Sequence, residues 1–282
     1  MTATDPRPAG AAAAVAVEHL VHVYPGATRA LDGVDLAVGT GERVAIVGQN
    51  GSGKSTLVRH FNGLLRPTEG RVRVGGRDAA DVRVAHLAAT VGLAFQDPDR
   101  QIFARTVRAE VAFGARNLGR AGTALDASVA AALTATGLES DAQTNPYDLG
   151  YSRRKLLALA SILAMETPVV VLDEPTTGQD ARGVDRVERI VADLAAAGRT
   201  VIAISHDMRF VADTFERVVV MREGRIVLDA SPDEAFAEGS WPTLASTYLE
   251  PPLAARVGAR LGLGSTPTDA RLIEALAARP AP

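Results

Sequence analysis

The chain has 282 residues, of which 47% are hydrophobic and 22% charged, and a formal net charge of −3. A chain of this size can bury a sizeable core in one large or two modest domains. It has no cysteine, which excludes disulfides, thiolate metal sites and cysteine nucleophiles. The acidic balance and the 4% of aromatic residues argue against a nucleic-acid surface. No stretch reaches the roughly 18 apolar residues that a membrane-spanning helix needs.

The first elements expected are a tail, a strand and a second, buried strand. Residues 1–14 are rich in alanine and proline, which predicts a flexible tail. Residues 14–24 alternate apolar and polar side chains before Pro25-Gly26, a pattern typical of a strand and a turn. Residues 41–48, GERVAIVG, are a short apolar run with β-branched residues, which indicates a strand buried on both faces.

A glycine-rich loop follows this buried strand. Residues 48–56, GQNGSGKST, match G-x-x-x-x-G-K-[ST] and open a predicted helix over residues 54–65. Glycines let backbone N–H groups approach phosphate oxygens, and the helix N-terminus favours anions. Lys54 is expected to reach the β- and γ-phosphates and Ser55 to offer its hydroxyl to Mg²⁺. The nucleotide-binding residues predicted here are Gly48, Asn50, Gly51, Ser52, Gly53, Lys54, Ser55 and Thr56.

Further strands are predicted at 70–76 and 91–96, and a mainly helical region, about 97–165, then interrupts the pattern. Within it, Leu156, Leu159, Ala160 and Leu163 repeat at helical spacing and form one apolar stripe. Strands alternating with helices indicate an α/β core with a largely parallel sheet. We interpret the helical region as an inserted subdomain.

Two acidic residues close the next buried strand, residues 168–175, PVVVLDEP. Neighbouring side chains at a strand end point in different directions, so Asp173 and Glu174 can take different roles. We expect Asp173 to hold Mg²⁺ and Glu174 to act as general base on the attacking water. Gln96 and His206 each follow a strand. They are the candidates for the metal shell and the γ-phosphate, although a lone Gln or His at such a place is more often structural.

The remaining elements are a hairpin and a C-terminal segment. Two strands meet at Glu223-Gly224, which indicates a hairpin turn. Residues 241–282 contain two short helical pieces around a break rich in Gly, Ser and Pro, and we interpret them as an accessory segment.

Taken in order, these motifs resemble the ATP-binding cassette ATPases of ABC transporters, over about residues 15–240. The resemblance implies a P-loop NTPase core with an N-terminal antiparallel β part and an inserted helical subdomain. It further implies ATP and Mg²⁺ as cofactors. Tyr24 stands where the family stacks an aromatic ring on adenine, and Asp180 matches the D-loop aspartate at the dimer seam.

Residues 95–119, FQDPDRQIFARTVRAEVAFGARNLG, resemble the segment after the Q-loop in energy-coupling factor importers of vitamins, cobalt and nickel. The matching residues are Asp97, Pro98 and Gln101, and Asp97 and Pro98 suit the first positions of a short helix. The resemblance implies a place on the cytoplasmic face of the membrane, beside a transmembrane coupling subunit and a substrate-binding membrane subunit. It leaves the transported substrate open.

The family's signature turn, Leu-Ser-Gly-Gly-Gln, corresponds here to Leu149, Gly150, Tyr151, Ser152 and Arg153, and only Leu149 agrees. Losing the serine removes a phosphate contact, and the ring of Tyr151 obstructs close backbone approach. Ser152 offers a shifted hydroxyl, and the basic residues at 153–155 add positive charge near a helix N-terminus. The alternative is an ordinary helix start with solvated basic residues.

Cassettes of this family work face to face, each ATP lying between one phosphate loop and the other subunit's signature. A degraded signature beside intact Glu174 and His206 favours an asymmetric heterodimer with a second cassette over a homodimer. The favoured function is the ATP-hydrolysing motor of an energy-coupling factor importer. The alternatives are an ATP-binding scaffold with little hydrolysis, the ATPase of another ABC class, and a soluble cassette of DNA repair or translation. Against the last alternative, such soluble proteins usually carry a long coiled coil or a second cassette, and this sequence shows neither.

Overall fold

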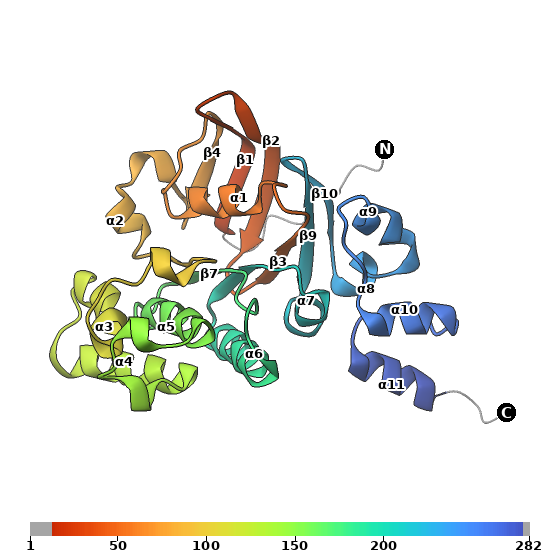
Figure 1. Cartoon of the computed structure of the whole chain (residues 1–282). Coiled ribbons are helices and arrows are strands. Elements are labelled where there is room, and N and C mark those ends of the chain that lie inside the picture. The colour runs from red at the N-terminus through yellow and green to blue at the C-terminus, as the bar shows by residue number, and fades with distance from the viewer. Residues whose placement is uncertain (1–12, 279–282) are drawn as a thin grey trace.

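The structure, a computed structural model, describes residues 13–278. It consists of a four-stranded and a six-stranded sheet with helices packed around them (Figure 1). Most of the predicted tail, residues 1–12, lies outside the described residues. Ala13 and Ala14 already belong to the first strand, so this strand begins slightly earlier than predicted.

The smaller sheet is antiparallel and has the order β2-β1-β4-β5. Its strands are β1 (Ala13–Tyr24), β2 (Thr28–Gly39), β4 (Glu69–Val74) and β5 (Arg77–Asp78). Sequence patterning missed β2, because Asp32-Gly33 resembles a turn. In the structure Leu20 pairs with Val34 and Val21 with Asp32, so Gly33, at φ +72°, forms a bulge within a continuous strand.

The larger sheet has the order β10-β9-β3-β8-β7-β6 and is parallel except for β10. Its strands are β3 (Arg43–Val47), β6 (Val91–Ala94), β7 (Val169–Asp173), β8 (Thr200–Ile204), β9 (Arg217–Arg222) and β10 (Arg225–Ala230). Glu223 and Gly224 both have positive φ and join β9 to β10 in a two-residue hairpin. The predicted α/β fold, with a largely parallel sheet and an N-terminal antiparallel part, is confirmed.

Two hydrophobic cores lie on the two faces of this sheet. Side chains alternate along each strand, so Val44 and Ile46 of β3 face one core while Ala45 and Val47 face the other. The first core includes α1 (Lys54–Phe61) and the antiparallel sheet, and the second includes the helices of the inserted region. Because the sheet is buried on both faces, its strands are almost wholly apolar.

The helical region between residues 97 and 165 packs beside the β6 edge of the sheet (Figure 1). It contains α3 (Val107–Asn117), α4 (Gly122–Thr136) and α5 (Tyr151–Leu163). The short helix predicted at Asp97-Pro98 is a single 3₁₀ turn, Pro98–Arg100, and the Asp97 carboxylate caps it by accepting from the Asp99 N–H at 3.1 Å. The remaining helices of the cassette are α2 (Val84–Leu87), α6 (Ala181–Ala196) and α7 (Met208–Thr214).

The C-terminal segment lies at the opposite end of the molecule, beyond β9 and β10 (Figure 1). It follows α8 (Pro232–Ala235) and contains α9 (Trp241–Ala245), α10 (Leu253–Arg260) and α11 (Asp269–Ala277). The two helical pieces predicted around a Gly/Ser/Pro break are α10 and α11. Within residues 13–278, no helix is long and apolar enough to cross a membrane.

Candidate functional site

The phosphate loop connects β3 to α1, the strand-loop-helix context that its sequence predicts. Two of its glycines leave no room for a side chain. A Cβ at Gly48, where φ is +146°, would lie 2.2 Å from the backbone oxygen of Met221. A Cβ at Gly53, where φ is +103°, would lie 2.6 Å from the backbone oxygen of Ala30. The loop is therefore held tightly against β9 and β2, in a conformation that only glycine adopts without strain.

Lys54 begins α1 and its ammonium lies within this loop. Its Nζ donates to the carbonyl oxygens of Gly48, at 2.7 Å, and Gln49, at 2.9 Å. Burial lowers the pKa of Lys54, while the carboxylates of Glu174 and Asp173 oppose that shift. An ammonium has three donors, so a further one remains for a phosphate oxygen.

Asp173 is the last residue of β7, and only 5% of it is exposed. Burial raises the pKa of its carboxyl group, and a hydrogen bond from the Ser55 side chain works in the opposite direction. The Oδ1 atom of Asp173 is buried and accepts no hydrogen bond from residues 13–278. A buried carboxylate oxygen without a partner, beside a serine hydroxyl, is a donor set that suits Mg²⁺. The predicted metal residues Ser55 and Asp173 are thus brought together.

Glu174 and His206 are also brought together, although 31 residues separate them. The Nδ1–H of His206 donates to Oε2 of Glu174 at 2.7 Å, and Thr177 donates to the same oxygen at 3.3 Å. Glu174 has φ +53°, an unusual value for a residue with a side chain. The His206 side chain is 62% exposed, whereas that of Glu174 is 9% exposed, so the imidazole covers the carboxylate from the solvent side.

The other two predicted residues lie at strand ends near this centre. Gln96 is exposed and follows β6 by two residues, and Ala94 in β6 pairs with Leu172 in β7. The register therefore places Gln96 beside the end of the strand that carries Asp173. Tyr24 ends β1, and its hydroxyl lies 3.1 Å from the Thr56 hydroxyl of α1. The Gln96 contact with metal and water and the Tyr24 contact with adenine stay predictions.

The signature turn forms the start of α5, as predicted, but its side chains bind within the chain. Gly150 is the N-cap and provides no side-chain cap. The Tyr151 ring lies over Gly178, where a Cβ would stand 2.9 Å from Tyr151 Cε1. Ser152 Oγ donates to Gln179 Oε1 at 2.7 Å, and Gln179 Nε2 donates to the Ser152 carbonyl oxygen at 3.0 Å.

The basic residues of this turn do not form the exposed positive cluster that the sequence suggests, nor an ordinary solvated face. Arg153 binds the Gly137 carbonyl oxygen and the Asp141 carboxylate. Arg154 pairs with Asp99 at 3.2 Å. Lys155 is buried, and its Nζ donates to the carbonyl oxygen of Glu174.

These contacts pair Arg153 and its neighbours within the chain, and a contact of Arg153 with a partner's phosphate stays a prediction. The acidic partners come from the turn after α4 and from the 3₁₀ turn after β6, which only the tertiary fold brings beside α5. Burial lowers the pKa of Lys155, and the charges of Glu174 and Asp173 oppose the shift.

Asp180 and its neighbours form the start of α6. The Asp180 carboxylate accepts from the backbone N–H of Gly183 at 2.8 Å, which is a helix N-cap contact. A contact of Asp180 at a dimer seam stays a prediction. Sequence analysis assigned no role to Thr177 or Gln179, and it counted Lys155 only as a positive charge of the signature turn. The stretch around Gln179 lies directly after Glu174, so sequence proximity to the predicted base was a signal that could have found two of the three.

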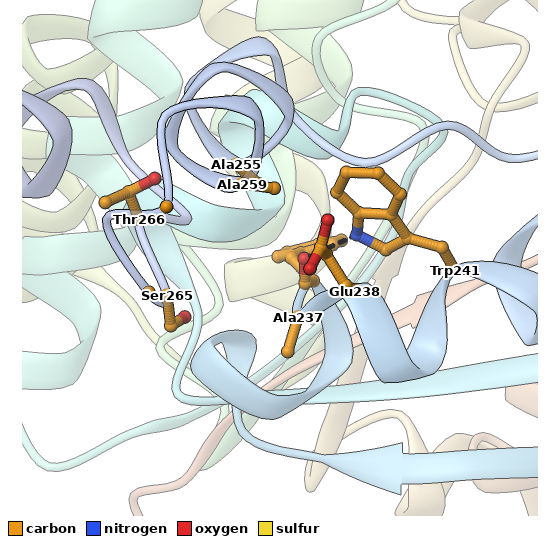
Figure 2. A pocket seen from close by; sticks show the side chains of 10 residues that line it. Ala237, Glu238, Trp241, Ala255, Ala259, Ser265 and Thr266 are labelled. Carbon is orange, nitrogen blue, oxygen red and sulfur yellow. Dashed lines mark hydrogen bonds between the residues drawn. The ribbon is translucent and has the colours of Figure 1, made fainter.

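A separate cavity of about 330 Å³ lies in the C-terminal segment, between the start of α9 and the end of α10 (Figure 2). Trp241 lines it, with its indole Nε1 donating to the Phe236 carbonyl oxygen at 2.8 Å. Most other described lining residues are small, such as Ala255 and Ala259, and Glu238 supplies a carboxylate. None of the predicted site residues lines this cavity, which is therefore separate from the predicted nucleotide site.

Comparison with known proteins adds independent observations. The family model described as ABC transporter matches residues 31–177. The chain is 41% identical over 226 residues to the energy-coupling factor transporter ATP-binding protein EcfA of Methanocaldococcus jannaschii. The match covers 79% of this chain and 81% of that relative.

A protein of Caldanaerobacter subterraneus subsp. tengcongensis, named as an ABC transporter ATP-binding protein, is 42% identical over 86% of this chain. The chain spans only 42% of that relative's length.

The structure of cbiO1 from Clostridium perfringens, described as part of the ABC transporter complex cbiONQ, superposes with a TM-score of 0.74. It is 34% identical to this chain, and the match covers 89% of this chain and 99% of cbiO1. The matched family region contains the phosphate loop and the Asp173-Glu174 strand end. The chain therefore belongs to the ABC transporter family, as one of its ATP-binding cassette ATPases.

Proposed function

We propose that this cassette is the ATP-hydrolysing motor of an energy-coupling factor importer for a vitamin or a transition-metal ion. The observation that carries the proposal is the Glu174–His206 hydrogen bond beside Lys54 and Asp173. A phosphate-binding lysine, a metal-binding carboxylate and a buried carboxylate held by an imidazole are the groups that hydrolysis of a terminal phosphate requires. The similarity to EcfA and cbiO1 supports the importer class.

Each group has a distinct role in this proposal. Lys54 and the loop N–H groups hold the phosphate oxygens, and Ser55 and Asp173 hold Mg²⁺, which neutralises phosphate charge when bound. Glu174 accepts a proton from the water that attacks the γ-phosphorus while the bond to the ADP oxygen breaks. His206 holds the Glu174 carboxylate in place. Its second ring nitrogen can donate to a phosphate oxygen when the ring is protonated.

The proposed assembly is a heterodimer with a second cassette. This chain keeps its own hydrolytic residues, while Gly150 and Tyr151 replace the serine and glycine that would contact the partner's nucleotide. Such a pair would hydrolyse mainly the ATP on this chain, provided that the partner supplies an intact signature turn. An ATP-binding scaffold without hydrolysis is the competing function, and the Glu174–His206 pair opposes it.

An exposed aromatic patch supports a membrane partner on the cytoplasmic face. Phe103 is 57% exposed and Phe113 44% exposed, and their rings meet edge to face with centroids 4.6 Å apart. Tyr147 is 54% exposed, and its hydroxyl donates to the Ile102 carbonyl oxygen. Exposed apolar groups of this kind mark interaction surfaces. The patch lies beside the Asp97–Gln101 segment, where we place the transmembrane coupling subunit.

Purification of the intact complex from detergent-solubilised membranes, through a tag on this chain, tests the proposal. We expect a second, different cassette, membrane subunits and Mg²⁺-dependent ATP hydrolysis. Phe103→Ser combined with Phe113→Ser should release the membrane subunits while the two cassettes stay paired. Two identical copies of this chain that both hydrolyse ATP at full rate would contradict the asymmetric assembly, and a complex without hydrolysis would favour the scaffold.

A further inference from the structure

The first turn of α5 is joined to the segment that follows the catalytic strand β7. Three contacts make this junction. Lys155 donates to the Glu174 carbonyl oxygen, Ser152 exchanges two hydrogen bonds with Gln179, and Tyr151 covers Gly178. Both ends of the segment 174–179 are therefore fixed to the same helix turn, which is the turn whose sequence departs from the family's signature.

We infer that this turn acts on its own chain, and that Lys155 is a positioning residue for the water-activating carboxylate of Glu174. The inference rests on the proposed role of Glu174 as general base. It assigns to the substituted turn a function other than binding the partner's phosphate. Tyr151, Ser152 and Lys155 brace the segment that carries the base.

The backbone of Glu174 explains why a brace is needed. Its φ of +53° is sparsely populated by residues with a Cβ and persists only where the surroundings hold it. Three hydrogen bonds do so. The Glu174 N–H donates to the Ile204 carbonyl oxygen at 2.9 Å, and its carbonyl oxygen accepts from Lys155 and, at 3.4 Å, from the Thr177 N–H. Breaking the Lys155 bond leaves this carbonyl with only the longer bond, which comes from within the same segment, so the peptide that follows Glu174 is held less firmly.

The position of Lys155 indicates a specific contact rather than a chance one. Lys155 is only 6% exposed. Burying an ammonium costs free energy unless hydrogen bonds replace those it made with water. The two arginines before it are placed differently, because each reaches a carboxylate nearer the surface. Lys155 alone of the three turns inward, beside Asp173 and Leu172 in the small cavity between α5 and β7.

The far end of the segment is held by side-chain complementarity. Gly178 has φ +77°, and the Tyr151 ring fills the space that a side chain there would need. The Ser152–Gln179 pair uses both the hydroxyl and the backbone carbonyl of Ser152. Because the same turn would face the partner's nucleotide in a cassette dimer, a shift of this turn would be transmitted to Glu174. The brace thus couples the two nucleotide sites through one chain.

Four variants of this chain, each purified in the complex with its partner subunits, test the inference. Lys155→Met removes the donor and keeps the side-chain volume, and Lys155→Arg keeps a charged donor. Arg43→Met, which breaks the surface pair with Glu216 away from this junction, is the matched control. Glu174→Gln removes the proposed base of this chain, so its residual turnover measures hydrolysis at the partner's nucleotide. For each variant kcat and KM for ATP are measured, together with ATP affinity and amide hydrogen exchange of residues 174–179.

Lys155→Met should lower kcat at least about 10-fold with KM and ATP affinity within about 3-fold of wild type, because only an aligned base is lost. Amide hydrogen exchange of residues 174–179 should become faster in this variant. Lys155→Arg should recover much of kcat, and Arg43→Met should match wild type. If Lys155→Met does not fold, Lys155→Gln, which keeps a neutral donor, should show a smaller fall in kcat with the same unchanged KM.

Two results would overturn the inference. One is that Lys155→Met and Lys155→Gln hydrolyse ATP with the kcat of wild type although Glu174→Gln abolishes hydrolysis. The other is a loss of ATP affinity equal to the loss of kcat, which would make Lys155 a structural residue of the nucleotide site. Normal hydrolysis by Glu174→Gln would instead contradict the proposed base itself, so the two failures are distinguishable.

Discussion

The phosphate loop and the signature turn both open a helix from a glycine, yet their glycines differ in their surroundings. Gly48 and Gly53 have positive φ and backbone atoms within 3 Å of any added Cβ. Gly150 has an ordinary φ of −64° and nothing within 4 Å of an added Cβ. The packing of the loop therefore requires glycine at these two positions, whereas the surroundings of Gly150 leave room for a side chain. In this chain the residues after Gly150 contact the segment 174–179 of the same chain.

The largest effect that would sharpen this comparison is expected from Lys54→Ala. The variant removes a buried ammonium that is aimed into the loop, and charge-assisted hydrogen bonds to phosphate are lost with it. We expect ATP affinity to fall about 100-fold, equivalent to about 2.7 kcal/mol. Equilibrium binding of a fluorescent ATP analogue measures it. Arg153→Ala is the control from the other region, and equal losses for both would contradict the contrast.

A pair of glycine substitutions tests the comparison on stability. Gly48→Ala forces a Cβ against the Met221 carbonyl oxygen at a strained φ, and we expect it to lower the free energy of unfolding by about 2 kcal/mol. Gly150→Ala meets open space and should change it by less than about 0.5 kcal/mol. Urea unfolding of the two variants gives both values. A similar loss at the two positions would show that the turn is as constrained as the loop.

The smallest expected effect belongs to Gly150→Ser, which returns a hydroxyl to the N-cap of α5. A serine N-cap can bond the free N–H groups of the first turn, so stability should rise by a few tenths of a kcal/mol. Thermal unfolding detects the change. A clear loss of stability would mean that the N-cap geometry of this turn does not accept a side chain.

Much of this fold follows from sequence pattern because its signals are local. The buried strands β3, β7 and β8 are continuous apolar runs, and Lys54, Asp173, Glu174 and His206 stand at their ends. The carboxyl ends of parallel strands meet at one edge of a sheet, so the order of these motifs was sufficient to predict that they converge. The resemblance of that order to a known family supplied the rest of the expected site.

The parts that sequence reasoning missed depend on contacts between distant segments. β2 contains a bulge at Gly33 that imitates a turn. Arg153 and Arg154 have the composition of a solvated or phosphate-binding face, yet their partners Asp141 and Asp99 reach them only through packing of the helical region. Lys155 looks like a third surface base, and only its burial against Glu174 shows otherwise.

The most direct test of the central claim is hydrolysis by the purified complex in which this chain carries Glu174→Gln. The account predicts that ATP affinity is retained and that turnover falls at least about 100-fold, because the general base is lost and the partner's nucleotide faces the substituted turn. Turnover equal to that of the wild-type complex would contradict it.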